Sequence, residues 1–130
     1  MSIKKEMLSK RNWAIYGITT DTEKFGYKIP EVMKENGYNV IGINKKYKGQ
    51  DILGIKVYGS LEEVTEEVDC IDVIVNPNIS MLVVDEAIKK GIKNIWFQPH
   101  TFNEEVIEKV KKADINYVDD DCVYAILTGE

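Results

Sequence analysis

The stretch Trp13-Ala-Ile-Tyr-Gly-Ile-Thr-Thr-Asp-Thr-Glu-Lys-Phe-Gly-Tyr-Lys28 runs from an apolar segment through Gly17 into a polar loop and then into a helical pattern. Such a turn can present backbone N–H groups and the positive end of a helix to a phosphate. A second apolar run ends at Asn44-Lys45-Lys46, where a nicotinamide-binding unit usually carries an acid for the ribose 2′-OH. The first turn predicts a nucleotide site, and the second indicates an extra phosphate on the nucleotide.

Length and composition narrow the class of protein. The 130 residues suffice for one domain that buries roughly two thirds of its unfolded surface. The net charge of −5 provides no basic field for a nucleic-acid partner. No apolar run reaches the roughly 20 residues that span a bilayer, and residues 1–12 lack the apolar region of a signal peptide. Because Cys70 and Cys122 are the only cysteines, free thiols and a cytoplasmic location are expected.

Apolar runs alternate with amphipathic ones along the chain. Near-continuous apolar runs predict parallel strands covered on both faces, at residues 13–16, 39–43, 71–75, 94–97 and 116–118. Helices are predicted at residues 26–36, from Ser60, from Ser80 to Lys90 and from Asn103, with a leading helix in residues 1–11. Short right-handed crossovers then predict a Rossmann-like, doubly wound α/β domain over residues 1–130. Its parallel sheet would have five strands in the order 3-2-1-4-5, with helices on both faces.

In such a sheet, ligands bind outside the carboxyl ends of the strands, where the strand order reverses. The prediction places this point between the first and fourth strands. The loops that follow the first four strands therefore form the expected site, at residues 17–26, 44–48, 76–80 and 98–102.

Six segments in register carry a family resemblance. They are Ala14-Ile-Tyr-Gly-Ile-Thr19, Gly37-Tyr-Asn-Val-Ile-Gly-Ile-Asn-Lys45, Val57-Tyr-Gly-Ser-Leu-Glu-Glu-Val64, Val68-Asp-Cys-Ile-Asp-Val-Ile-Val-Asn-Pro77, Glu86-Ala-Ile-Lys-Lys-Gly-Ile-Lys-Asn-Ile-Trp-Phe-Gln98 and Asp121-Cys122. Together they cover nearly the whole chain, which resembles the small stand-alone CoA-binding proteins and the nucleotide-binding domain of the succinyl-CoA synthetase α subunit. The resemblance implies a domain that binds the ADP half of coenzyme A, with no catalytic residues to carry over.

Three positions depart from the pattern of that family. Gly26 stands where Ser is common before the helix, and Asn76 stands where a basic residue often precedes the proline. The run Asp120-Asp121-Cys122 lacks the usual Arg before the cysteine. The last two departures remove positive charge, which bears on the affinity for the ligand more than on its type.

The residues of the first loop each have two interpretations. Gly17 is either a tight turn or a phosphate contact. The hydroxyls of Thr19 and Thr20 either satisfy the turn or donate to a pyrophosphate oxygen. Lys24 is expected near the phosphates, whereas Lys28 is expected to be a solvated surface charge.

Lys45 is the more specific candidate for a contact with the extra phosphate. Two neighbouring cations at a strand end gain nothing structurally and repel each other mildly, so a 3′-phosphate on the ribose would offset that cost. The alternative is a solvated pair of charges. Asn44 is a candidate for a ribose or phosphate contact. The full set of predicted binding residues is Gly17, Ile18, Thr19, Thr20, Lys24, Gly26, Ile43, Asn44, Lys45, Asn76, Pro77, Ile79, Gln98 and Cys122.

The later loops contribute the remaining candidates. Pro77 and Ile79 either face an adenine or simply follow the end of a strand, and Gln98 is expected to reach the pantetheine amides. Cys122 is expected near the mouth of the site, where its acidic neighbours make a reactive nucleophile unlikely and the ligand thiol is a natural partner. His100 is the only histidine, which excludes a multi-histidine metal site, so no metal is expected.

The expected function is therefore non-covalent binding of CoA or an acyl-CoA, without catalysis. One alternative is an NADP-dependent reductase, which would use the same turn and the same lysines. It is disfavoured because no second domain carries a substrate site and no Tyr-Lys or His-acid pair is evident. The other alternative is a regulatory module that senses CoA and docks on a protein partner or a second copy of the chain.

Overall fold

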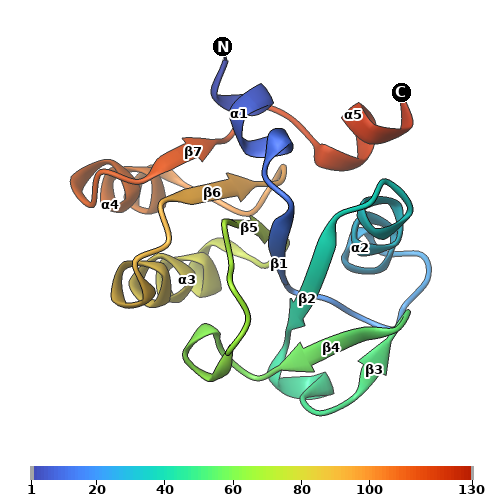
Figure 1. Cartoon of the computed structure of the whole chain (residues 1–130). Coiled ribbons are helices and arrows are strands. Elements are labelled where there is room, and N and C mark those ends of the chain that lie inside the picture. The colour runs from blue at the N-terminus through green and yellow to red at the C-terminus, as the bar shows by residue number, and fades with distance from the viewer. Residues whose placement is uncertain (1, 130) are drawn as a thin grey trace.

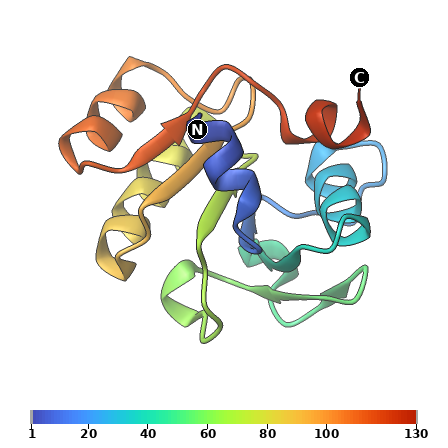
Figure 2. The same cartoon turned by 45° about the horizontal axis from the view of Figure 1, so that its top comes forward.

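In the computed structural model, the described chain comprises residues 2–129. A central sheet is covered by helices on both faces (Figures 1 and 2). The helices are α1 (Ile3–Ser9), α2 (Phe25–Glu35), α3 (Pro77–Lys90), α4 (Glu104–Lys112) and α5 (Val123–Thr128), with short 3-10 helices η1 (Lys45–Tyr47) and η2 (Leu61–Glu63). The strands are β1 (Asn12–Tyr16), β2 (Asn39–Ile43), β3 (Asp51–Ile52), β4 (Ile55–Tyr58), β5 (Cys70–Val73), β6 (Asn94–Phe97) and β7 (Asn116–Val118). The predicted α/β class is confirmed, and α1 is the expected leading helix, although Met1 lies outside the described residues.

The strand order corrects the prediction. Within the described residues, the sheet has seven strands in the order β3-β4-β2-β1-β5-β6-β7, and only the β3–β4 pair is antiparallel. The predicted five strands in the order 3-2-1-4-5 are therefore wrong. β4 pairs in parallel with β2, and β5 pairs with β1 instead of lying beyond β2. Along the chain the parallel strands follow the doubly wound order 3-2-1-4-5-6, so the order reverses between β1 and β5, not beside β6.

The missed strands form a tight hairpin at the edge of the sheet. Ile52 and Ile55 pair across a two-residue turn, in which Leu53 has φ 58° and Gly54 has φ 75°. Turns with two positive φ values usually carry Asn-Gly or Asp-Gly, and the leucine here hides that signal. The helix predicted from Ser60 is the short helix η2, and α3 begins at Pro77 rather than after Ser80.

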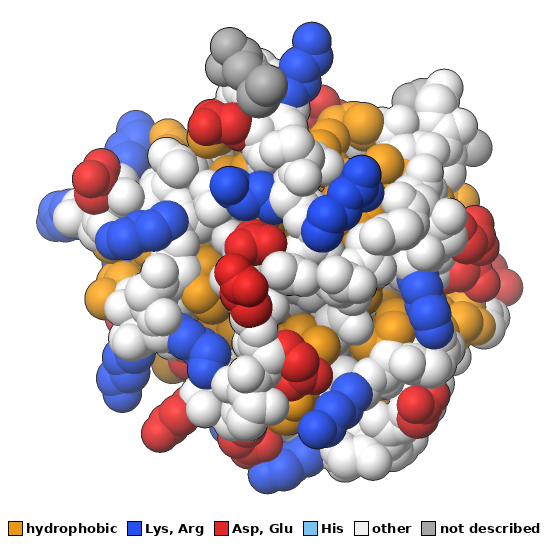
Figure 3. Space-filling view, in the orientation of Figure 1, with side chains coloured by type: hydrophobic (Ala, Val, Ile, Leu, Met, Phe, Trp, Pro, Cys, Tyr) orange, Lys and Arg blue, Asp and Glu red, His pale blue; other side chains and the backbone are white. Residues whose placement is uncertain are grey.

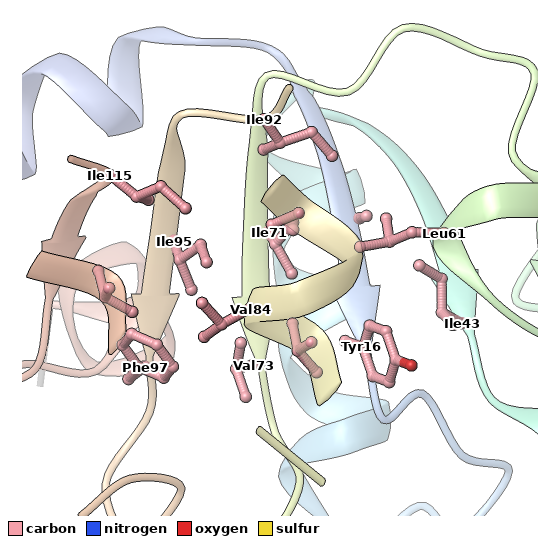
Figure 4. Packing of buried hydrophobic residues seen from close by; sticks show 14 of the residues in the cluster. Tyr16, Ile43, Leu61, Ile71, Val73, Val84, Ile92, Ile95, Phe97 and Ile115 are labelled. Atoms are coloured by element: carbon pink, nitrogen blue, oxygen red, sulfur yellow. The ribbon is translucent and has the colours of Figure 1, made fainter. Parts of the chain in front are cut away.

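Two apolar layers hold the sheet between its helices. Side chains alternate along β1: Ala14 and Tyr16 join the layer under α3 and α4, whereas Trp13 and Ile15 join the layer under α1, α2 and α5. Figure 4 shows Val84 of α3 lying over the sheet in the first of these layers. Because both faces are buried, the central strands are near-continuously apolar, as the sequence indicated. None of the described helices is both long and apolar enough to cross a membrane.

Candidate functional site

Two pockets flank the carboxyl end of β1. The α3 pocket, of about 620 Å³, lies against α3 and is lined by Tyr16, Gly17, Ile43, Asn44, Lys45, Gly59, Ser60, Glu62, Val75, Ile79, Leu82, Asp85, Glu86 and Lys89. The α2 pocket, of about 580 Å³, lies at the N-terminus of α2 and is lined by Gly17, Thr19, Glu23, Lys24, Phe25, Gly26, Asn44, Lys46, Tyr47, Ile74 and Val75. Gly17, Asn44 and Val75 line both pockets, so the two adjoin where the strand order reverses.

Close packing of the first loop requires glycine at two positions. Gly17 has φ +113°, and a Cβ there would lie 2.8 Å from the carbonyl oxygen of Ile74. A Cβ on Gly26 would lie 2.5 Å from the carbonyl oxygen of Gly17. Gly26 therefore lets the first turn of α2 approach the end of β1, as the last glycine of a dinucleotide-binding turn does. The glycine that departs from the family pattern has this structural reason.

Pro30 helps to fix the same loop. It is the sixth residue of α2, beyond the first turn, where a proline is ordinarily tolerated. A proline has no N–H for the carbonyl four residues before it, which here belongs to Gly26. That carbonyl instead accepts a hydrogen bond of 3.2 Å from the Thr19 N–H. The proline thus frees an acceptor, and this acceptor folds the loop back onto its helix.

The N-terminus of α2 is left open. Lys24 occupies the N-cap position without a side-chain cap bond, and the first turn contains no acidic residue. Among the described residues, the N–H groups of Phe25 and Gly26 donate to no protein acceptor. By contrast, Asn76 caps α3, because its Oδ1 accepts from the Ile79 N–H at 3.0 Å. The bare end of α2 lines the α2 pocket, where an anion would meet free donors and the positive end of the helix dipole.

Asn44 joins the loops after β1 and β2. Its Nδ2 donates to the carbonyl oxygen of Ile18 at 2.8 Å, and its Oδ1 accepts from the Lys46 N–H at 3.0 Å. The side chain is therefore committed to holding the loops together. The short helix η1 that follows directs its two lysines apart, because Lys45 lines the α3 pocket and Lys46 lines the α2 pocket.

A half-buried network of hydrogen bonds links three elements at the α3 pocket. The Tyr16 hydroxyl donates to Glu86 Oε2, and the Leu61 N–H donates to Glu86 Oε1 at 2.8 Å. Burial, together with the Glu86 carboxylate, raises the pKa of Tyr16 well above its usual range, so the phenol stays neutral. One carboxylate thus ties α3 to β1 and to the segment after β4. Ile79 and Leu82, which are 38% and 56% exposed, supply an apolar wall.

The structure gathers most of the predicted site residues around these pockets. Gly17, Ile43, Asn44, Lys45 and Ile79 line the α3 pocket, and Gly17, Thr19, Lys24, Gly26 and Asn44 line the α2 pocket. Within the described residues, the two linings do not include Ile18, Thr20, Asn76, Pro77, Gln98 or Cys122. Ile18 packs in the core, Pro77 follows the α3 cap, and Thr20 contacts Tyr47. Contacts of any of these residues with a ligand stay predictions.

Gln98 and Cys122 lie away from the pockets. Gln98 is 3% exposed, and its Nε2 donates to Asp72 Oδ1 at 2.6 Å beneath the surface. Cys122 is half-buried and precedes α5, whose Tyr124 ring contacts the ring of Phe25 with centroids 5.7 Å apart. Cys122 therefore lies outside both pocket linings, at the start of the helix that packs against α2.

Several pocket residues escaped the sequence analysis. Leu82 was not predicted as a site residue, because α3 begins earlier than the sequence indicated. In the structure, Ile79 and Leu82 share one face of that helix. Gly59 and Ser60 follow the missed strand β4. Tyr47 follows the two lysines, and only the helical turn of η1 brings it to the α2 pocket. Among the described side chains, no group of three or more His, Cys, Asp or Glu is arranged to hold a metal ion.

The fold and the paired pockets define a Rossmann-like nucleotide-binding domain. Comparison with known families is specific: residues 11–128 match the model of the CoA binding domain. The chain belongs to this CoA-binding domain family.

Two curated relatives are enzymes with CoA in their names. An acetate-CoA ligase (ADP-forming) of Methanocaldococcus jannaschii is 35% identical over 109 residues, which cover 80% of this chain and 15% of the ligase. The acetate-CoA ligase (ADP-forming) II subunit alpha of Pyrococcus furiosus is 26% identical over 124 residues, covering 87% of this chain and 27% of the subunit. The chain therefore spans a small part of either relative.

A solved structure of similar size has the same fold. A conserved hypothetical protein from Pyrococcus furiosus superposes with a TM-score of 0.84 at 31% identity. The match covers 90% of this chain and 99% of that protein. The architecture thus occurs both as a small protein and as one part of larger ligases.

Proposed function

We propose that this domain binds coenzyme A or an acyl-CoA non-covalently through the ADP half, without chemistry of its own. The observation that carries the proposal is the open N-terminus of α2, whose free Phe25 and Gly26 N–H groups line a pocket together with Lys24 and Lys46. A pyrophosphate needs such donors and cations. Membership of the CoA-binding domain family supports CoA as the ligand that contains this pyrophosphate.

The adenosine then occupies the α3 pocket. Its apolar wall of Ile79 and Leu82 suits the face of a base, and Lys45 lies in the same pocket for a 3′-phosphate on the ribose. The pyrophosphate crosses at Gly17, where the two pockets adjoin, onto the end of α2. The pantetheine arm leaves past Phe25 toward α5, which is where Cys122 would meet the ligand thiol.

The ligase relatives suggest a setting for this binding. Both carry CoA in the name of the reaction they perform, and this chain corresponds to a fraction of each. We therefore propose that the domain holds CoA, and that any acyl transfer depends on residues of a protein partner. A homodimer and a cytoplasmic location also stay predictions.

Thermal denaturation in the presence of nucleotides tests the proposal. A ligand at 100 times its Kd stabilises the native state by about 2.7 kcal/mol, which is several degrees in Tm for a domain of this size. CoA should produce such a shift, and NAD, which lacks the third phosphate, should produce much less. No shift at millimolar CoA would contradict the proposal, and a larger shift with NADP than with CoA would favour a reductase.

A further inference from the structure

Three hydroxyl groups converge at the mouth of the α2 pocket. The Tyr47 hydroxyl lies 3.3 Å from Thr19 Oγ1 and 3.4 Å from Thr20 Oγ1. Both threonines belong to the loop after β1, whereas Tyr47 ends η1 after β2. The phenol therefore bridges the two loops at the pocket where the proposed function places the pyrophosphate.

The ring of Tyr47 holds this hydroxyl in place. It is half-buried against the apolar layer that contains Ile18, Ile52 and Val57. The Asn44 side chain bonds the backbone of η1 and that of Ile18, so both sides of the bridge have fixed supports. The hydroxyl is thus presented to the pocket by packed structure rather than by a free side chain.

We propose that Tyr47 is a ligand-contacting residue, which donates its phenol proton to a pyrophosphate oxygen of CoA and exchanges its threonine contacts for that bond. This role of Tyr47 rests on the proposed function, because it requires CoA to be bound in the α2 pocket. Hydrogen bonds between a neutral donor and a phosphate oxygen are among the stronger ones in proteins. A phenol can make this bond only while it keeps its proton.

The surroundings of Tyr47 make that proton sensitive to pH. Hydrogen bonds from Thr19 and Thr20, with a smaller effect of the Lys46 charge, lower the pKa of Tyr47 to about 8. The other charged groups of the α2 pocket are Glu23 and Lys24, on the loop after β1. The apolar layer against which Tyr47 packs includes Val57 of β4. A phenolate would repel the phosphates, so binding should weaken as pH rises past this value.

Calorimetric titration of CoA and dephospho-CoA, from pH 7 to pH 9, tests the proposal with Tyr47→Phe. The variant keeps the packed ring and loses only the hydroxyl. At pH 7 we expect it to bind both ligands about tenfold more weakly than the wild type. Between pH 7 and pH 9 the wild-type affinity should fall by about tenfold, whereas that of Tyr47→Phe should change far less. Titrations of the ligand itself affect both proteins equally and cancel in this comparison.

Two further variants separate the outcomes. Tyr117→Phe, which removes a half-buried phenol on β7, should bind as the wild type does. Thr20→Val removes one hydroxyl that lowers the pKa of Tyr47, so the weakening should begin at higher pH. If the wild type binds CoA and Tyr47→Phe binds it equally well, the role of Tyr47 is overturned and the proposed function stands. If Tyr47→Phe loses affinity for CoA but not for dephospho-CoA, the assignment of Tyr47 to the pyrophosphate is overturned. A wild type that binds no CoA at pH 7 overturns the proposed function and this inference with it.

Discussion

Polar atoms lack a protein partner at two contrasting places in the described chain, and the two places differ in what completes them. Between β5 and β6, Asp72 Oδ2 and Gln98 Oε1 are buried and unpaired among the described residues. At the start of α2, the Phe25 and Gly26 N–H groups are free at the wall of an open pocket. The buried pair is shut off from solvent, since Asp72 is 0% and Gln98 3% exposed, whereas the pocket is open to water or an anion. An unpaired group in the core governs stability, and one at the pocket governs affinity.

A single proton would give both unpaired oxygen atoms of the buried pair a partner. Gln98 Nε2 already donates to Asp72 Oδ1, and a proton on Oδ2 would let the acid donate in return to Gln98 Oε1. Burial raises the pKa of Asp72 to about 7, although the Gln98 bond opposes that shift. The helix end needs instead a group with negative charge, which a phosphate supplies. Figure 3 shows acidic and basic side chains interspersed over one face of the molecule, so the attraction of an anion depends on local groups.

The largest effect is expected for Asp72→Asn. The pKa of Asp72 is about 7 in the folded protein and about 3.9 when unfolded, so the unfolded chain binds fewer protons between these values. Stability from this residue is full below about pH 4 and falls by up to roughly 4 kcal/mol as pH rises through 7. Asparagine can pair with Gln98 without a charge. The variant should therefore unfold at a higher urea concentration than the wild type at pH 8, and at a similar urea concentration at pH 4.

The affinity for CoA should not change in Asp72→Asn, because the pair lies outside both pockets. Asp114→Asn removes an exposed carboxyl as the matched control and should show no such dependence on pH. A stability difference for Asp72→Asn that is the same at pH 4 and pH 8 would contradict a protonated core pair.

Charge reversal at the pocket should act on affinity instead. Lys45→Glu deletes a cation from the α3 pocket and adds repulsion, so it should weaken CoA binding by about 2–3 kcal/mol. Dephospho-CoA, which lacks the 3′-phosphate, should be affected much less. Lys46→Glu, in the α2 pocket, should weaken both ligands alike. If titration calorimetry finds that Lys45→Glu weakens both equally, Lys45 does not read the 3′-phosphate.

Gly26→Ala should disturb the open helix end through its packing. The added Cβ would lie 2.5 Å from the Gly17 carbonyl oxygen, so α2 must move away from β1. We expect a loss of about 1–3 kcal/mol in stability and at least about tenfold in CoA affinity. Gly91→Ala is the control, since its Cβ would meet no atom within 4 Å. That control should cost about 1 kcal/mol through its positive φ and leave affinity unchanged; equal affinities in both variants would rule out a packed approach of α2.

The smallest effect is expected for two substitutions of Lys24, which compare a capped start of α2 with an open one. Lys24→Asn and Lys24→Ala both remove the charge, but only asparagine can cap α2 as Asn76 caps α3. Lys24→Asn should therefore be about 1 kcal/mol more stable than Lys24→Ala without ligand, and it should bind CoA more weakly. Chemical denaturation and calorimetry measure the two quantities. Equal CoA affinities in the two variants would show that the ligand does not use these N–H groups.

The sequence predicted the parallel strands well, apart from β4, and it missed the hairpin at one edge. The middle strands β1, β2, β5 and β6 are mostly buried on both faces and were detected, as was the edge strand β7. The β3–β4 hairpin is short and turns on Leu53-Gly54, which is not a usual signal, and missing it shifted the strand order. The loops of the site were found because they follow the detected strands.

Side-chain partners from other strands were beyond the sequence. Gln98 is polar at a strand end, which favoured a ligand contact, but its partner is Asp72 on the neighbouring strand. No sequence pattern around either residue predicts that hydrogen bond. Pro30 lies beyond the first turn of α2, and the hydrogen bond from the Thr19 N–H to the Gly26 carbonyl compensates for its missing N–H. That bond comes from the loop before the helix, so the helical sequence alone does not predict it.

A titration of the ¹⁵N-labelled protein with CoA, followed by the backbone amide resonances, tests whether the pyrophosphate binds at the start of α2. The Phe25 and Gly26 amides should shift strongly as they bond the pyrophosphate. The Ile79 amide, already bonded to Asn76, should shift less despite lying beside the α3 pocket. Saturation with CoA that moves Ile79 but leaves Phe25 and Gly26 unchanged would contradict a pyrophosphate site at the start of α2.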